Sequence, residues 1–166
     1  KNISVEMSAP DFSVEGNQFS PLKKEGDYYL LKLKNNKKPL AIIPVSMGNP
    51  HAVVEVKNLR DYPVAEVGKA VSTHKCFREG VNVSFTELIS RTQLNLKVYE
   101  RGVGETNACG TAACAAVACG IKLGKLDSEV LVEQPGGILS INWDGFEKPM
   151  IMSGPSKKVY EGVFEG

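Results

Sequence analysis

The feature that most constrains this chain is a run of small apolar residues from Ala108 to Leu123. Its middle part, Ala112–Ala118, reads Ala-Ala-Cys-Ala-Ala-Val-Ala, and alanine has the highest helix propensity of any residue. From Ala112 onward no face carries a polar side chain until Lys122. Because a helix that is apolar all round must be buried, we predict a helix over 109–123 that is enclosed by strands.

Both ends of this helix carry signals in the sequence. Thr106 or Asn107 is the predicted N-cap, since either side chain can accept a hydrogen bond from an unpaired amide. Gly120 and Gly124 indicate the other end. The preceding stretch, 100–106, contains two glycines and two acids and is predicted to be a loop.

Cys109 lies at or next to the first turn of the predicted helix. Unpaired backbone N–H groups converge there, and the helix dipole favours negative charge. Such positions make thiolates available near neutral pH, and the same amides can bind a carboxylate or phosphate. Cys109 is therefore a candidate reactive residue, although free cysteines are also often small core residues.

Composition excludes several classes of protein. The 166 residues fit one domain, and a hydrophobic content of 42% suffices for a core. Twenty basic and nineteen acidic residues leave a net charge of +1, which predicts no nucleic-acid partner. No segment is long and apolar enough to predict a membrane span. Four cysteines without zinc-type spacing favour reduced thiols, no metal and a cytoplasmic location.

The rest of the chain is predicted to be mainly strand. Period-two or β-branched runs bounded by turn residues predict strands over 3–7, 28–34, 40–47, 52–56, 81–85, 94–99, 129–133, 138–143 and 149–153. Residues 8–24 are predicted to be loop, and 48–51 a tight turn. Tyr62–His74 shows a helical apolar stripe. The predicted fold is a single α+β domain over 1–166, with a mixed, mostly antiparallel sheet or open barrel around the buried helix.

Few other residues suggest chemistry. His51 follows a Gly-Asn-Pro turn, where a histidine is usually exposed, and Asn82 alternates within a predicted strand. Glu100 could act as acid, base or orienting group, and Arg101 could bind a carboxylate in a bidentate pair. Glu105 could cap the helix.

Two motifs carry a resemblance to a known family. Gly-Asn-Pro-His at 48–51 and Glu-Arg-Gly-x-Gly-Glu-Thr-x-Ala-Cys-Gly-Thr at 100–111 resemble diaminopimelate epimerase. Ile3–Phe12 resembles the opening of the second half of that family's protein, so the likeness spans the whole chain but only the family's C-terminal half. The sequence departs from the family at Ala52, often Cys, at Ala112, often Gly, and after Phe77, where a proline is usual.

The resemblance implies a mechanism without cofactor or metal. In the family two cysteines, one from each half, remove and return a proton on opposite faces of the α-carbon of diaminopimelate. By residue match Cys109 is the cysteine of this half, with His51 and Glu100 close to the reacting centre. The implied substrate-binding residues are Asn49, Asn82, Glu100, Arg101, Gly110 and Thr111. The implied partner is the missing N-terminal half; the sequence leaves homodimer formation open.

Three alternatives stay open at this stage. A related isomerase of the same architecture, resembling proline racemase or phenazine-biosynthesis enzymes, is the first. The second is a self-contained cysteine hydrolase that uses Cys109, His51 and Glu100 as a triad. The third is a binding module without catalytic activity.

Overall fold

The computed structural model of the chain describes residues 2–13, 19–20, 23–34 and 37–164. Within them lie eleven strands and two helices. The strands are β1 (Asn2–Met7), β2 (Lys23–Glu25), β3 (Tyr28–Leu31), β4 (Leu40–Ser46), β5 (Pro50–Glu55), β6 (Asn82–Ser90), β7 (Gln93–Glu100), β8 (Gly104–Thr106), β9 (Glu129–Gln134), β10 (Gly137–Asn142) and β11 (Met150–Pro155). The helices are α2 (Val64–Ser72) and α3 (Gly110–Lys122). No helix in this described part is long and apolar enough to cross a bilayer.

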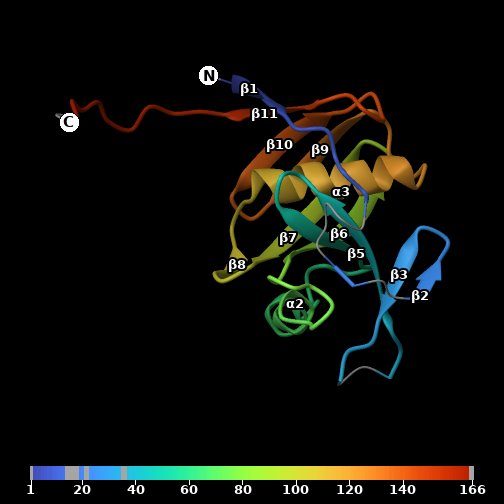
Figure 1. The fold of residues 1–166 in the computed structure, drawn as a ribbon. Coiled ribbons are helices and arrows are strands. Elements are labelled where there is room, and N and C mark those ends of the chain that lie inside the picture. Colours follow the sequence, from blue (N-terminus) through green and yellow to red (C-terminus); the bar gives the residue numbers. More distant parts are fainter. Residues whose placement is uncertain (1, 14–18, 21–22, 35–36, 165–166) are drawn as a thin grey trace.

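All of these strands form one mixed sheet (Figure 1). Their order is β1-β11-β10-β9-β7-β6-β5-β4-β3-β2. The pairs β5–β6 and β7–β9 are parallel, and the other pairs are antiparallel. β9 and β8 pair with the same edge of β7. β9 pairs with the first residues of β7, and β8 pairs with the last.

The two parallel pairs explain where the helices lie. α2 connects β5 to β6, and α3 lies between β7 and β9, so both connections advance in the same direction across the sheet. Because β6 and β7 are antiparallel, the two crossovers start from strands of opposite direction. Right-handed crossovers then require the helices to pack on opposite faces. They do so, with α2 below and α3 above the sheet in Figure 1.

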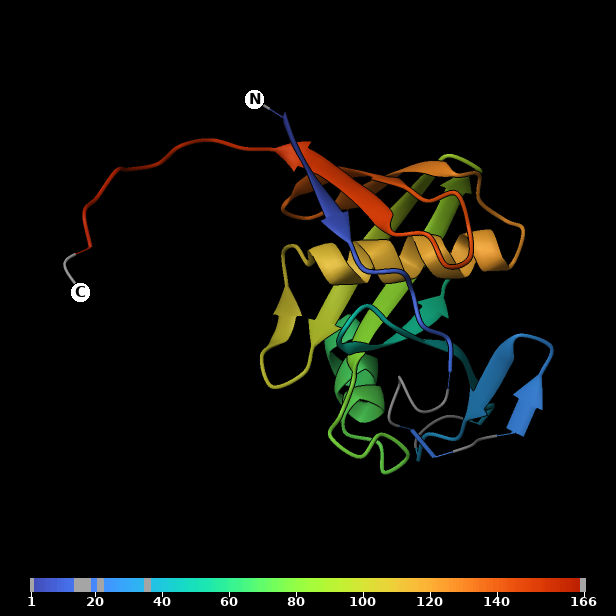
Figure 2. The same cartoon turned by 45° about the horizontal axis from the view of Figure 1, so that its top comes forward.

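The sheet encloses α3, as the sequence predicts. Every residue from Ala112 to Gly120 is buried. Side chains of β4–β7 pack on one side of the helix, and β9–β11 curl over the other (Figure 2). The cluster includes Val45, Val98 and Ile141, from strands far apart in the sequence. The predicted mixed sheet around one buried helix is confirmed.

Three local predictions are wrong. The predicted loop over 8–24 overlaps β2, part of it lying outside the described residues. The predicted loop over 100–106 ends in β8, which pairs with the edge of β7 that β9 leaves open. Neither Thr106 nor Asn107 caps α3: the N-cap is Cys109, and no side chain, Glu105 included, bonds to the cap amides. β2 and β8 are three-residue strands that form only by pairing with the neighbouring strands β3 and β7, which local propensity does not encode.

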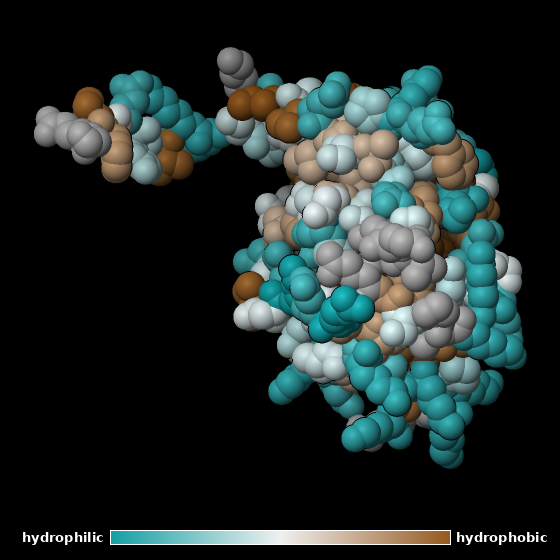
Figure 3. All heavy atoms as spheres, in the orientation of Figure 1, coloured by the Kyte–Doolittle hydropathy of each residue, from teal (hydrophilic) through white to brown (hydrophobic). Residues whose placement is uncertain are grey.

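The described part of the chain ends in an extended tail over 156–164 that leaves the sheet (Figure 1). Its apolar side chains Val159, Tyr160, Val163 and Phe164 are all exposed. Figure 3 shows brown spheres among hydrophilic ones along the tail and a second brown patch at the place of β1. Ile3 and Val5 of β1 are about half exposed.

Gly68→Ala tests the packing of α2 on the sheet. A Cβ at Gly68 would overlap the Cβ of Tyr99 on β7. We expect the substitution to lower the free energy of unfolding by about 1–3 kcal/mol, the usual cost of overpacking, although alanine favours a helix by about 1 kcal/mol. Urea denaturation measures this. Ala65→Gly, at an exposed position of α2, is the control for propensity alone, and a Gly68→Ala chain more stable than wild type would contradict the packing.

Candidate active site

Three of the predicted residues share one rung of the sheet. His51 on β5 is directly opposite Asn82 on β6. The pairing of β6 with β7 begins at Val83 and Tyr99, and continuing this register by one residue sets Asn82 opposite Glu100. Glu100 is opposite Gly104 on β8. Side chains alternate along a strand, and the neighbours Val53 and Val98 belong to the α3 core. The rung therefore presents a histidine, an amide and a carboxylate on the face that α3 covers.

Cys109 lies where β8 leads into α3. Its backbone is extended, with φ −147° and ψ 112°, and its carbonyl accepts the first helical hydrogen bond from Ala113 N–H at 3.1 Å. No side chain caps the following amides. The thiol therefore stands beside the unpaired N–H groups of the first turn, where a thiolate or a carboxylate is stabilised.

Gly110 and Thr111, the next two residues, shape this first turn. A Cβ at Gly110 would lie 2.9 Å from Sδ of Met152 on β11, so glycine lets the helix start close to that strand. The hydroxyl of Thr111 lies 3.4 Å from Sγ of Cys109. The structure thus brings Cys109, Gly110 and Thr111 together, as the resemblance implies.

A hydrogen bond joins the rung to the loop before Cys109. Thr106 donates its hydroxyl hydrogen to a carboxylate oxygen of Glu100 at 2.6 Å. Only two residues separate Thr106 from Cys109. The carboxylate of Glu100 therefore helps to fix the chain that carries the thiol.

His51 is fully buried, which corrects the prediction of an exposed turn histidine. Its Nε2 lies 3.1 Å from Oδ1 of Asn49, an acceptor, so Nε2 carries the hydrogen and Nδ1 a lone pair. Nδ1 is buried without a partner among the described residues. Burial lowers the pKa of His51 to about 4. At neutral pH the ring is therefore an uncharged acceptor facing the core side of the site.

Asn82 and Arg101 have structural partners of their own. Asn82 is buried, and its Oδ1 accepts the backbone N–H of Arg101 at 2.9 Å. The guanidinium of Arg101 donates to the Glu79 carbonyl at 3.2 Å and lies 4.0 Å from the Glu79 carboxylate. Its side chain also contacts the position of Gly80. In this structure Arg101 is therefore directed to the loop before β6, away from the rung.

Gln134, at the end of β9, is a residue that the sequence analysis did not select. Its side-chain oxygen accepts the backbone N–H of Cys109 at 2.9 Å. The sequence showed only a Gln-Pro-Gly-Gly hairpin turn. A polar residue at the inward position of the alternating run 129–134 was the available signal.

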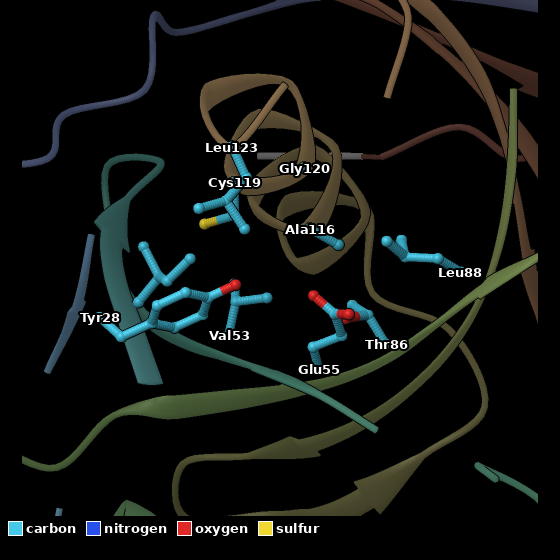
Figure 4. A pocket seen from close by; sticks show the side chains of 10 residues that line it. Tyr28, Val53, Glu55, Thr86, Leu88, Ala116, Cys119, Gly120 and Leu123 are labelled. Carbon is cyan, nitrogen blue, oxygen red and sulfur yellow. The ribbon is translucent and has the colours of Figure 1, made fainter. Parts of the chain in front are cut away.

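At the other end of α3 the packing leaves a cavity of about 20 Å³ (Figure 4). Ala116 and Thr86 line it, together with Tyr28 and Glu55. The last two accept hydrogen bonds from Lys125 at 3.3 and 2.5 Å. Space of this size holds one water molecule, so it is a packing gap and no substrate site. Among the described residues, no three His, Cys, Asp or Glu side chains come together as metal ligands.

Solved structures share this fold. A hydroxyproline epimerase from Agrobacterium vitis aligns with a TM-score of 0.63 at 11% identity, over 92% of this chain and 49% of that chain. A probable proline racemase from Agrobacterium radiobacter K84 aligns with a TM-score of 0.57 at 13% identity, over the same shares. At these identities the likeness concerns the fold alone. The domain has the fold of about half of a racemase or epimerase chain.

Closer sequence relatives narrow this class to one family. The profile of the diaminopimelate epimerase family matches residues 43–159. The diaminopimelate epimerase of Teredinibacter turnerae is 54% identical over 96% of this chain and 57% of its own length. That of Buchnera aphidicola is 46% identical over 98% of this chain and 56% of its own. The chain belongs to the diaminopimelate epimerase family, and it spans a little over half the length of these relatives.

Alkylation of the four free cysteines tests the setting of Cys109. Burial raises the pKa of Cys76 to about 11 and of Cys114 to about 12, and it also raises that of Cys119. At pH 8 only about one in a thousand of such thiols, or fewer, is a thiolate. Cys109 is partly exposed at a helix N-terminus. We expect peptide mapping after iodoacetamide treatment to show Cys109 modified at least about a hundredfold faster. Equal labelling of Cys114 would contradict the arrangement, and Cys109→Ser is the control.

The burial of His51 predicts a pH dependence of stability. Its folded pKa is about 4, against 6.5 for an ordinary histidine. The unfolded chain therefore binds more protons between these values, and stability falls as the pH falls from 6.5 to 4, by up to about 3 kcal/mol. Urea denaturation of wild type and His51→Gln across this pH range gives the free energy of unfolding of each chain. The difference between the two chains separates the contribution of His51 from that of the carboxylates. Parallel pH dependences of the two chains would show that the native state tolerates the charged ring.

Proposed function

We propose that this chain forms the C-terminal half-site of a diaminopimelate epimerase, which interconverts LL- and meso-diaminopimelate for lysine and peptidoglycan precursors. The observation that carries the proposal is the position of Cys109. It is the N-cap of a helix buried along its middle, and relatives that are 41% and 54% identical to this chain are diaminopimelate epimerases. In this proposal residues 1–166 are one domain, and a preceding half completes the enzyme.

The first step of the proposed reaction is binding of the substrate carboxylate at the N-terminus of α3. The N–H groups of Gly110 and Thr111 have no helical acceptor, and no side chain caps them. Together with the Thr111 hydroxyl they can bind both oxygens of the carboxylate. These donors also stabilise the added negative charge when the α-carbon loses its proton and the carboxylate gains enolate character.

In the second step Cys109, as the thiolate, removes the α-proton from the face that it meets. The C–H electron pair stays on the substrate and spreads into the carboxylate, and the proton passes to Sγ. In the reverse direction the same thiol returns its proton. The chemistry requires no cofactor in this proposal, because the thiolate and the oriented amides supply the base and the charge stabilisation.

The rung of His51, Asn82 and Glu100 is proposed to orient the rest of the substrate. The uncharged His51 offers an acceptor, and Glu100 an anionic one, both suited to a substrate ammonium group. Asn49 and Asn82 are proposed to bind the distal amino-acid end. Arg101 is proposed to bind the same end of the substrate, for which its side chain must first leave Glu79. The Arg101–Glu79 ion pair is exposed, so breaking it costs little free energy.

Inversion requires a second acid on the opposite face of the α-carbon, which we assign to the missing half. Cys114 and Cys119 are buried further along α3, and Cys76 is buried beyond α2. Ile3, Val5 and the tail side chains Tyr160 and Phe164 offer apolar surface against which that half could pack. The partners in the proposal are thus diaminopimelate and this half, in a reducing cytoplasm, with homodimer formation left to measurement.

The alternative triad enzyme has less support. A triad needs the histidine within hydrogen-bond reach of both the thiol and the acid. His51 instead bonds to Asn49, and Glu100 to Thr106. The low pKa of His51 also makes it a poor proton acceptor.

Activity of the isolated and the completed site tests the proposal. We expect residues 1–166 alone to show no interconversion of diaminopimelate stereoisomers, because one thiol serves one face and water enters the open site. Adding the N-terminal half of a relative, fused or as a separate chain, should restore interconversion with deuterium uptake from heavy water. Cys109→Ala should abolish it. Full interconversion by this chain alone, lost in His51→Ala, would place the second base within it and refute the half-site.

A further inference from the structure

The turn between β9 and β10 holds the segment before α3 at two points. Oε1 of Gln134 accepts the backbone N–H of Cys109 at 2.9 Å. Two residues later, the N–H of Gly136 donates to the Asn107 carbonyl at 2.7 Å. The first contact joins positions 109 and 134, 25 residues apart, and the second joins positions 107 and 136, so together they tie the start of α3 to the turn between β9 and β10.

The contact is close and largely dry. Gln134 is only 5% exposed. A Cβ at Gly136 would lie 3.0 Å from the Asn107 carbonyl oxygen and 3.1 Å from the Cβ of Ala108, so the turn approaches the loop as closely as a glycine allows. A buried hydrogen bond in such a place fixes orientation, because its loss would leave a buried amide unpaired.

We infer that Gln134 is a positioning residue for the Cys109 thiol, acting through the backbone N–H of Cys109 as an uncharged acceptor. The inference rests on the proposed role of Cys109 but adds a residue to it. The N-cap amide is not part of the helix, so no helical bond sets its direction. The hydrogen bond to Gln134 sets the direction of the Cys109 N–H. By fixing the backbone there, it also sets the direction of Sγ relative to the amides of Gly110 and Thr111.

The acceptor of the Cys109 N–H carries no charge. A carboxylate in the same place would also accept the N–H, and the helix dipole would favour it. By covalent geometry it would stand within about 7 Å of Sγ. There it would repel a thiolate and a substrate carboxylate. An amide provides the same hydrogen bond and leaves the positive end of α3 to the thiolate and the ligand.

The elements packed around the thiol carry few titratable groups. On α3 this group is Cys114, on β5 it is the neutral His51, and on β7 it is the carboxylate of Glu100, which accepts a hydrogen bond from Thr106. β8 contributes Glu105, and β9 contributes Glu133, both exposed. β11 contributes Met152, which is uncharged. A carboxylate at position 134 would therefore add a buried negative charge near the thiol, where the other carboxylates are exposed or hydrogen-bonded.

The experiment measures iodoacetamide labelling of Cys109 against pH in this chain. Gln134→Glu should raise the pH of half-maximal labelling by about one unit, the effect of one charge at about 7 Å in a partly screened site. The Cys109 N–H favours the ionised form of the new side chain. Glu133→Gln, the adjacent exposed position, is the matched control and should leave the profile unchanged. An unchanged profile for Gln134→Glu would overturn the inference.

A second measurement separates positioning from charge and does not depend on Gln134→Glu folding. Gln134→Met keeps the length of the side chain and removes the acceptor. Hydrogen exchange at the Cys109 amide should become at least tenfold faster, while Cys114 on the same helix stays protected. Unchanged exchange at Cys109 would refute the role. Neither readout needs turnover, so a failed epimerase assay would leave this inference standing, and its failure would leave the epimerase proposal untouched.

Discussion

The structure depends on the burial of a helix that has no polar face. Alanine side chains give α3 little volume of its own, so the sheet must approach closely from every side to exclude water from it. One flat sheet layer cannot do this. The sheet therefore continues past β7 into β9–β11 and curls over the helix, which is why valines and isoleucines from both halves of the chain meet in one cluster. Only the ends of α3 can reach solvent, and the N-terminal end carries Cys109.

The handedness of the two crossovers then places the polar rung. Since α2 and α3 connect parallel pairs of opposite direction, they occupy opposite faces, and each helix packs on its own cluster of buried apolar residues. On the α3 face β6 carries three buried polar residues, Asn82, Ser84 and Thr86. Thr86 donates to the Val54 carbonyl, and the Ser84 hydroxyl has no partner among the described residues. His51, Asn82 and Glu100 lie on that rung, with Asn49, Arg101 and Thr106 as partners. The rung thus places hydrogen-bonding groups near the N-terminal end of α3, where the burial of the helix stops.

Composition and period predicted the elements well, because the signals are local. The alanine run gave the buried helix within one residue, and most strands follow alternation or β-branching. What failed depends on how strands pair with one another. β8 exists because β9 leaves part of β7 unpaired, and His51 is buried because β4 and β6 flank it. The motif residues of the site were selected from the sequence, but the position of Arg101 beside Glu79 and the contact of Gln134 with Cys109 follow from the tertiary fold alone.

The three cysteines of the α3 segment show how one helix can separate a reactive thiol from inert ones. Their spacing of five residues turns each by about 140° from the last, so they point in different directions. Cys114 and Cys119 meet the enclosing sheet, and burial keeps them protonated. Cys109 precedes the first helical residue, where the enclosure ends. That opening gives the thiol access to a ligand, but it also admits water, which weakens the electrostatic stabilisation that an enolate-like state needs. A second half over this opening would supply both the missing acid and the low dielectric, so the two requirements have a single structural solution.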